Sequence, residues 1–217
     1  MKFEYAFKFE DGTERSFPLP LDDTTGLLQL PEPQAPPPDW AKLDHCKCPH
    51  CPFDSAKVAY CPVAKNLAQA ADAFKDEKSF KKCTVFVKGQ ERFYGKQTDL
   101  QTGLQAMFGL IMATSDCPHM APLRHLTKTH LPFATVDETR VRIFGSYLLA
   151  QHEKHQKGEP ADFEATGLNK IFAALNTLNI HVINRIRSVS KGDTNQNAIV
   201  LLDSFASLLS FSAPKKT

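Results

Sequence analysis

The sequence lacks the features that place a protein in a membrane or on nucleic acid. Its first twelve residues, MKFEYAFKFEDG, alternate charged and aromatic side chains and contain no apolar core of a signal peptide. No apolar run approaches the length of a membrane span. The formal net charge is only +2, and no long basic run occurs. These absences favour a cytoplasmic protein whose partner is another protein rather than a membrane or a nucleic acid.

Motifs that identify common enzyme classes are also absent. The chain contains no HExxH metal motif, no nucleophile elbow and no glycine-rich phosphate loop. It therefore offers no recognisable nucleophile and no evident acid–base pair.

The hydrophobic pattern at the N-terminus predicts a β-hairpin. Phe3, Tyr5, Phe7 and Phe9 share one face of a strand, and residues 11–12, Asp-Gly, supply the turn to a return strand. A second strand pair is expected at residues 82–88 and 91–94, and the two pairs together predict one antiparallel sheet.

Helical periodicity predicts a small bundle after residue 98. Residues 114–134 show no period and predict a loop, whereas Thr135 and Glu138 have the spacing of a capping box. The helix that they open has an apolar stripe of Val141, Phe144 and Leu148. Expected helices begin at Pro62, Asp99, Thr135, Asp162 and Asp193, and the apolar stripe of the second contains Leu100, Leu104, Met107, Phe108 and Ile111. Polar side chains of the long fourth helix, Arg185 among them, are expected on its wet face or as links between helices.

Three segments follow from this pattern. Residues 1–30 form the hairpin region, and residues 31–38, PEPQAPPP, form a stiff proline-rich connector. Residues 39–217 hold a cysteine-rich loop and an α+β helical body, which forms one compact unit with the hairpin. The expected fold is therefore α+β, with an antiparallel sheet from two hairpins beside a mostly helical bundle. A cysteine-rich metal loop is expected to join the two parts.

Cysteine is followed by proline far more often than chance predicts. Random placement would give roughly 0.4 Cys-Pro pairs, whereas four of the six cysteines have proline after them. Proline fixes its own φ and restricts the preceding residue, which suits a cysteine held in one orientation toward a common centre. The four cysteines are Cys48, Cys51, Cys61 and Cys117.

These four residues are the predicted metal ligands. Cys48 and Cys51 form a CxxC unit, in which two thiolates on one turn can reach the same ion. Cys61 lies close enough in the chain to return to that ion, and Cys117 would tie the helical part to it. Cys46 and His45 are alternatives for the fourth position. Cys83, inside a predicted strand, is interpreted as a small buried hydrophobe.

Four thiolates suit Zn²⁺ first and a [4Fe–4S] cluster second. Such a site is closed, because no coordination position is left for water, and a closed site is structural or sensory rather than catalytic. A reduced cysteine cluster without metal is the other interpretation. A thioredoxin-type dithiol is disfavoured, because no βαβ unit surrounds the motif.

The segment 115–135 contains three histidines, His119, His125 and His130. Neutral imidazoles could bind a second metal, or one of them could act as a general base. The alternative is that they hydrogen-bond to the backbone and fix the loop.

The motifs CPHCP, YCPVA and CPHMAPLRHLTKTHLPFA give the chain a resemblance to a known family. It resembles an uncharacterised bacterial family described only as a domain of unknown function, over nearly the whole chain. The signature elements of that family match Cys48, Cys51, Cys61, Cys117, His119 and His130. The resemblance implies a bacterial cytoplasmic protein and supplies no activity.

Three functions are therefore compared. The first is a metal-stapled interaction or regulatory module without its own catalysis, which we favour. The second is an iron–sulfur or thiol-based redox or metal sensor. The third, least supported, is a metal-dependent enzyme that uses the 117–130 loop and predicts convergence of its histidines in a cleft.

Overall fold

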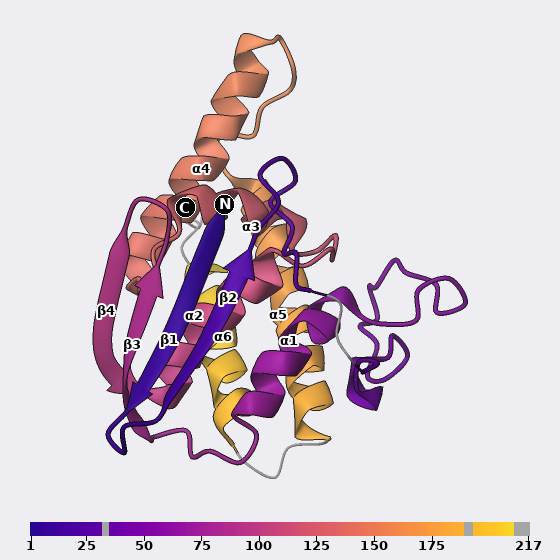
Figure 1. The fold of residues 1–217 in the computed structure, drawn as a ribbon. Coiled ribbons are helices and arrows are strands. Elements are labelled where there is room, and N and C mark those ends of the chain that lie inside the picture. Colours follow the sequence, from indigo (N-terminus) through magenta and orange to yellow (C-terminus); the bar gives the residue numbers. More distant parts are fainter. Residues whose placement is uncertain (32–34, 189–192, 211–217) are drawn as a thin grey trace.

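The fold consists of a four-stranded antiparallel sheet packed against helices (Figure 1). The computed structural model describes residues 1–31, 35–188 and 193–210. The strands are β1 (Lys2–Phe9), β2 (Glu14–Pro20), β3 (Lys82–Lys88) and β4 (Phe93–Asp99). The helices are η1 (Asp39–Ala41), α1 (Pro62–Ala73), α2 (Leu100–Ala113), α3 (Ala121–Arg124), η2 (His125–Thr129), α4 (Val136–Gln156), α5 (Thr166–Arg187) and α6 (Thr194–Ser210). The predicted α+β class is confirmed.

The sheet has the order β2-β1-β3-β4, so the N-terminal hairpin and the second strand pair join through β1 and β3. The alternation predicted for β1 is confirmed, because all four aromatic residues of its inward face are buried. The fourth strand was expected at residues 91–94, but it spans Phe93–Asp99. Its polar sequence gave no apolar alternation, because an edge strand with most of its side chains exposed needs none.

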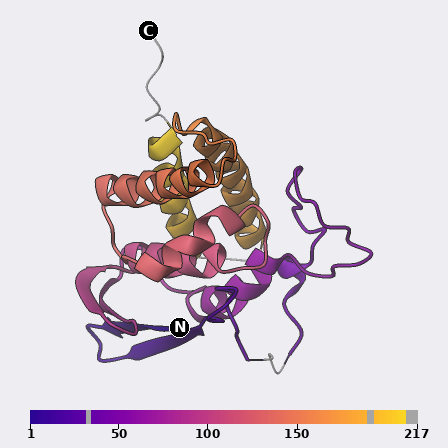
Figure 2. The same ribbon diagram turned by 90° about the horizontal axis from the view of Figure 1, so that it is seen from above.

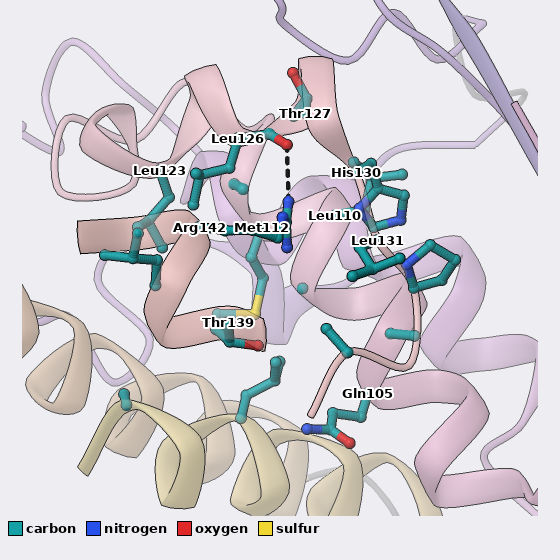
Figure 3. A pocket seen from close by; sticks show the side chains of 18 of the residues that line it. Gln105, Leu110, Met112, Leu123, Leu126, Thr127, His130, Leu131, Thr139 and Arg142 are labelled. Carbon is teal, nitrogen blue, oxygen red and sulfur yellow. Dashed lines mark hydrogen bonds between the residues drawn. The ribbon is translucent and has the colours of Figure 1, made fainter. Parts of the chain in front are cut away.

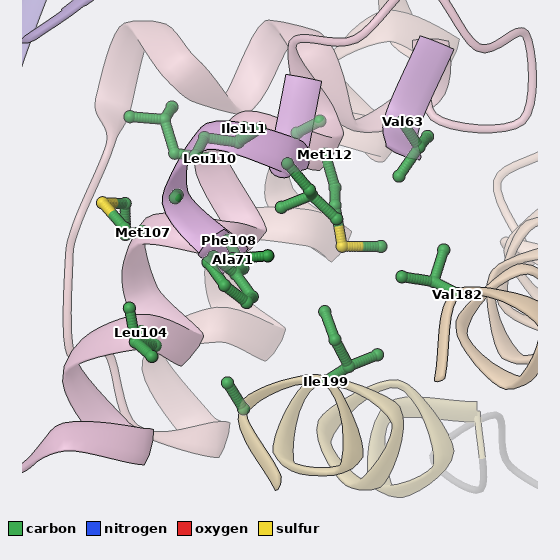
Figure 4. Packing of buried hydrophobic residues seen from close by; sticks show 14 of the residues in the cluster. Val63, Ala71, Leu104, Met107, Phe108, Leu110, Ile111, Met112, Val182 and Ile199 are labelled. Atoms are coloured by element: carbon green, nitrogen blue, oxygen red, sulfur yellow. The ribbon is translucent and has the colours of Figure 1, made fainter. Parts of the chain in front are cut away.

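The buried face of the sheet packs closely on α2. A methyl group at Gly103 would lie 2.7 Å from Cγ2 of Val85 and 2.8 Å from Cε1 of Phe7. A glycine inside this helix therefore allows the helix and the sheet to approach each other. Phe108 and Met112 of α2 lie in the same hydrophobic cluster as Val182 of α5 and Ile199 of α6 (Figure 4). The expected apolar stripe of α2 is confirmed as the centre of the core.

Helix α4 is less embedded than the pattern predicted. Its capping box between Thr135 and Glu138 is confirmed. The predicted stripe is wrong at Val141, which is 72% exposed, and at Leu148, which is 37% exposed, whereas its third residue, Phe144, packs against the core. Ile143 is the buried apolar residue of this helix. The C-terminal half of α4 extends beyond the rest of the body (Figure 1), so it has little surface to pack against.

Three smaller expectations need correction or completion. The 114–134 segment is not a plain loop, because it contains α3 and η2. Helix α5 begins at Thr166 rather than at Asp162, whose carboxylate accepts hydrogen bonds from the backbone N–H of Gly167 at 2.7 Å and from the Thr166 hydroxyl at 3.2 Å. The proline-rich connector lies partly outside the described residues, and Trp40 after it is buried.

The cysteine-rich loop lies against helices rather than between the sheet and the bundle. It projects on the side of α1 and α5, while the sheet occupies the opposite side in both views (Figures 1 and 2). The sheet and the helices meet directly through α2, so the expectation that the loop joins them is wrong. Within the described parts of the chain, no helix has the length and apolar character needed to cross a membrane.

Candidate metal centre

The cysteine loop, residues 42–60, is closed at its base by backbone hydrogen bonds. The N–H of Leu43 donates to the carbonyl of Ala59 at 2.9 Å, and the N–H of Cys61 donates to the carbonyl of Ala41 at 2.8 Å. Within the loop, the N–H of Cys51 donates to the carbonyl of Cys48 at 3.0 Å. The CxxC unit thus forms the tight turn that its spacing predicted.

The two outlying cysteines stand where helical segments begin. Cys61 is the N-terminal cap of α1, with extended backbone angles, and Pro62 is the first residue of that helix. The carbonyl of Cys117 accepts hydrogen bonds from the N–H groups of Met120 at 3.0 Å and Ala121 at 3.2 Å. Proline after each cysteine fits these positions, because the first turn of a helix does not use its N–H.

All four predicted ligands line one small cavity. Its volume is about 20 Å³, and Cys48, Cys51, Cys61 and Cys117 surround it together with apolar side chains, Lys47, His119 and Arg185. Three separate segments thus bring their thiols to one place. In the described residues, however, no three His, Cys, Asp or Glu side chains are placed so that they could hold an ion. Ligation by these four residues therefore stays a prediction that requires the thiols to turn toward a common centre.

Two of the four thiols, those of Cys48 and Cys117, are held in their protonated form by this environment. Burial raises the pKa of Cys48 to about 12, and the nearby Cys61 adds to the increase while Arg185 opposes it. Burial also raises the pKa of Cys117. A bound cation would reverse this preference, because a metal ion favours the thiolate and displaces its proton.

The alternative ligands point elsewhere. Cys46 is exposed, and its carbonyl lies 3.0 Å from Nδ1 of His181. Nε2 of His45 lies 2.8 Å from the hydroxyl of Ser188. Neither residue lines the cavity; Cys46 links the loop to His181 within α5, and His45 links it to Ser188 at the C-terminal cap of α5. Cys83 is buried in β3, and burial raises its pKa to about 11, so its interpretation as a small hydrophobe is confirmed.

Arg185 was expected either on the wet face of α5 or as a link between helices. It is 1% exposed, so the wet face is wrong, whereas its bond to Trp40 of η1 agrees with a link between helices. Its guanidinium donates to three backbone carbonyls, those of Trp40 at 2.9 Å, Lys42 at 2.6 Å and Leu43 at 2.9 Å. Helical spacing contained the signal, because Arg185 follows Val182 by three residues on the same inward stripe. The arginine fastens the base of the loop to α5 and places a positive charge beside the thiols.

The three histidines of the 115–135 segment do not converge. His119 lines the cysteine cavity, and its Nε2 lies 2.9 Å from the carbonyl of His50. The rings of these two residues are 4.0 Å apart, and burial lowers the pKa of His50. His125 is exposed, whereas His130 contacts the hydroxyl of Tyr5 at 2.7 Å. The cleft of histidines that an enzyme would need is not formed by these residues.

Fold and site together define an α+β protein with four cysteines around one buried cavity. A sequence family described as "Domain of unknown function (DUF6901)" matches residues 3–216, nearly the whole chain. The chain therefore belongs to this family, and the expected membership of a domain-of-unknown-function family is confirmed. No curated protein and no solved structure matches the chain.

Proposed function

We propose that the chain is a metal-stapled interaction or regulatory module without catalysis of its own. In this proposal a Zn²⁺ ion binds to Cys48, Cys51, Cys61 and Cys117 and fixes the cysteine loop to the helical body. The observation that supports the proposal is that these four cysteines, from three separate segments, line one cavity.

The charge of the surroundings supports a metal–thiolate centre. A Zn²⁺ ion with four thiolates carries a net negative charge, which needs a compensating cation when it is buried. Arg185 supplies such a cation beside the cavity. In the described residues its guanidinium has only carbonyl partners and forms no ion pair with a carboxylate. An arginine that is buried without an acid fits a site whose negative charge arrives with the metal.

The size of the cavity favours a single ion over a cluster. About 20 Å³ holds roughly one water-sized sphere. A [4Fe–4S] cube is several times larger and would require the loop to move outward.

The role of each residue follows from this arrangement. The four thiolates bind the ion, Arg185 offsets their charge, and His119 holds the turn of the loop through the carbonyl of His50. Four protein ligands leave no position for a substrate, so the site stabilises structure or responds to oxidation of its thiolates. Exposed apolar side chains on α4, such as Val141 and Leu149, offer a surface for a protein partner.

The test compares two Cys→Ser variants, one at a cysteine that lines the cavity and one at a cysteine that does not. Wild type, Cys51→Ser and Cys46→Ser are purified without oxygen and examined by elemental analysis and visible absorption. We expect colourless wild type and Cys46→Ser with about one equivalent of zinc per chain. We expect Cys51→Ser to lose the zinc and more than about 2 kcal/mol of unfolding free energy.

Two other outcomes would change the conclusion. Brown protein that contains iron would favour the sensor function with a [4Fe–4S] cluster. Metal-free wild type, or a Cys51→Ser variant with unchanged metal content and melting temperature, would contradict the proposed ligand set.

A further inference from the structure

A second cavity, larger than the first, lies among α2, the 117–134 segment, α4, α5 and α6 (Figure 3). Its volume is about 220 Å³. A cavity of roughly 150 Å³ lined by apolar side chains is enough to bind benzene. This cavity therefore has room for a small organic ligand on the order of ten heavy atoms.

The cavity is mostly apolar, with one permanent charge at its wall. Leu110, Leu123 and Ile143 are among the many aliphatic side chains that line it. Arg142 of α4 reaches the same space, and none of the described lining residues is acidic. Figure 3 shows Arg142 among these apolar side chains, with its guanidinium directed to the carbonyl of Leu126.

The guanidinium of Arg142 is only partly satisfied. Nη2 donates to the carbonyl of Leu126 at 3.0 Å, and the buried Nε has no hydrogen-bond partner in the described parts of the chain. Glu138, one turn earlier on α4, accepts from the backbone N–H of Thr135 at 2.8 Å in the capping box and forms no ion pair with Arg142. Burial lowers the pKa of Arg142, and the Coulombic effects of Tyr94 and Glu138 oppose this decrease only in part.

The other ionisable group of the cavity does not compete for an anion. Nε2 of His130 is 2.7 Å from the hydroxyl of Tyr5, and its ring packs edge-to-face on Phe3. Burial lowers the pKa of His130 to about 3, so the ring is uncharged at neutral pH. Arg142 is thus the cation toward which a negative group in this cavity would turn.

We propose that this cavity binds a small monocarboxylate with an apolar tail. The carboxylate pairs with the Arg142 guanidinium, and the tail lies among Leu110, Leu123 and Ile143. One arginine neutralises one carboxylate, whereas a doubly charged phosphate would keep an uncompensated charge in an apolar space. The proposal is independent of the metal centre, because the two cavities share none of their lining residues.

A bound carboxylate would also connect α4 to the body. Arg142 and Ile143 belong to α4, while Leu110 belongs to α2 and Leu123 to α3. A ligand between these helices would add contacts to α4, which otherwise packs against the body over only a small part of its surface. We therefore expect slower hydrogen exchange of the backbone amides around Arg142 when the ligand is bound.

The experiment titrates the intact chain with three probes: octanoate, 1-octanol and acetate. Octanoate has both the charge and the tail, whereas each of the others has only one of them. We expect octanoate to bind at least about tenfold more tightly than 1-octanol and acetate, as a charge-assisted hydrogen bond implies. Binding is followed by calorimetry and by amide chemical shifts of α4.

Two variants locate the anion. Arg142→Gln removes the charge from the cavity, and Arg140→Gln removes a charge two residues away that pairs with Asp137 and does not line the cavity. We expect Arg142→Gln to weaken octanoate binding about tenfold or more, and Arg140→Gln to leave it within about twofold.

Three results would overturn the proposal. They are the absence of octanoate binding, equal affinity for octanoate and 1-octanol, and undiminished octanoate binding by Arg142→Gln. If Arg142→Gln fails to fold, the comparison of the three probes on wild type still decides whether a carboxylate is recognised.

Discussion

Among the residues that the structure describes, Arg185 and Arg142 form no ion pair with a carboxylate, and they mark two different kinds of buried site. Arg185 uses its donors on three backbone carbonyls and borders a cavity of about 20 Å³ lined by thiols. Arg142 donates to one carbonyl and borders a cavity of about 220 Å³ lined by aliphatic side chains. Arg185 is part of the structure that holds the cysteine loop. Arg142, in contrast, keeps an N–H donor, Nε, that has no acceptor among the described residues.

The difference shows that a buried cation can affect the stability of a protein in two different ways. A buried charge whose hydrogen bonds are all made to the backbone stabilises a particular chain geometry, and its loss leaves carbonyls unpaired. A partly buried charge beside apolar space costs stability in the free protein, and a ligand can recover that cost. Each of the following predictions tests one side of this comparison.

The largest effect is expected for Arg185→Met. This change leaves the carbonyls of Trp40 and Leu43 without a donor and takes one of two donors from the carbonyl of Lys42, so we expect a loss of about 3 kcal/mol or more in unfolding free energy. The matched control is Arg187→Met on the same helix, whose side chain is exposed and bonded to Gln196. Chemical denaturation should show a change of less than about 0.5 kcal/mol for the control. Equal losses in the two variants would refute the structural role of Arg185.

A smaller, pH-dependent effect is expected at His130. Its pKa is about 3 in the folded state because of burial, and about 6.5 in the unfolded chain. The unfolded state therefore binds more protons between these values, so the stability supplied by neutral His130 is present above pH 6.5 and lost as the pH falls. We expect a loss on the order of 1 kcal/mol per pH unit between pH 6 and 4.

His130→Gln isolates this contribution, because glutamine keeps a polar group near Tyr5 and does not titrate. Unfolding free energies of both proteins are measured from pH 7 to pH 4. The advantage of wild type over the variant should shrink as the pH falls. A constant difference across this range would show that the histidine is not buried as described.

The smallest effect on stability is expected for Arg142→Met in the free protein. The change removes one hydrogen bond to Leu126 but places an apolar chain beside an apolar cavity. The two contributions nearly cancel, so we expect a change within about 1 kcal/mol, measured by denaturation without ligand. A loss as large as that of Arg185→Met would erase the distinction between the two arginines.

The sequence predicted the parts of the fold that have regular apolar spacing. The aromatic face of β1, the stripe of α2 and the capping box at Thr135 were all found where periodicity placed them. Strand β4 was displaced because its exposed edge carries polar residues. The inward face of α4 was misjudged because a helix that projects from the body can expose apolar side chains, Val141 among them.

The sequence predicted which cysteines line the candidate site, but it did not predict the residues that surround them. Proline after each of four cysteines marked the residues that line one cavity. The partner that joins them, Arg185, is distant in sequence and belongs to a residue type that is usually exposed. The Arg142 cavity left no sequence motif, because it is formed by side chains from five separate segments. Tertiary packing alone brings such residues together.

The most direct test of the metal staple is hydrogen exchange of the purified protein before and after treatment with a strong zinc chelator. The backbone N–H groups of Leu43 and Cys51 are hydrogen-bonded within the cysteine loop, and those of β1 are hydrogen-bonded in the sheet. If a zinc ion fixes the loop to the helical body, chelation should accelerate exchange of the loop amides by about tenfold or more and leave the β1 amides unchanged. Loop amides that exchange at the same rate with and without chelator would contradict the account.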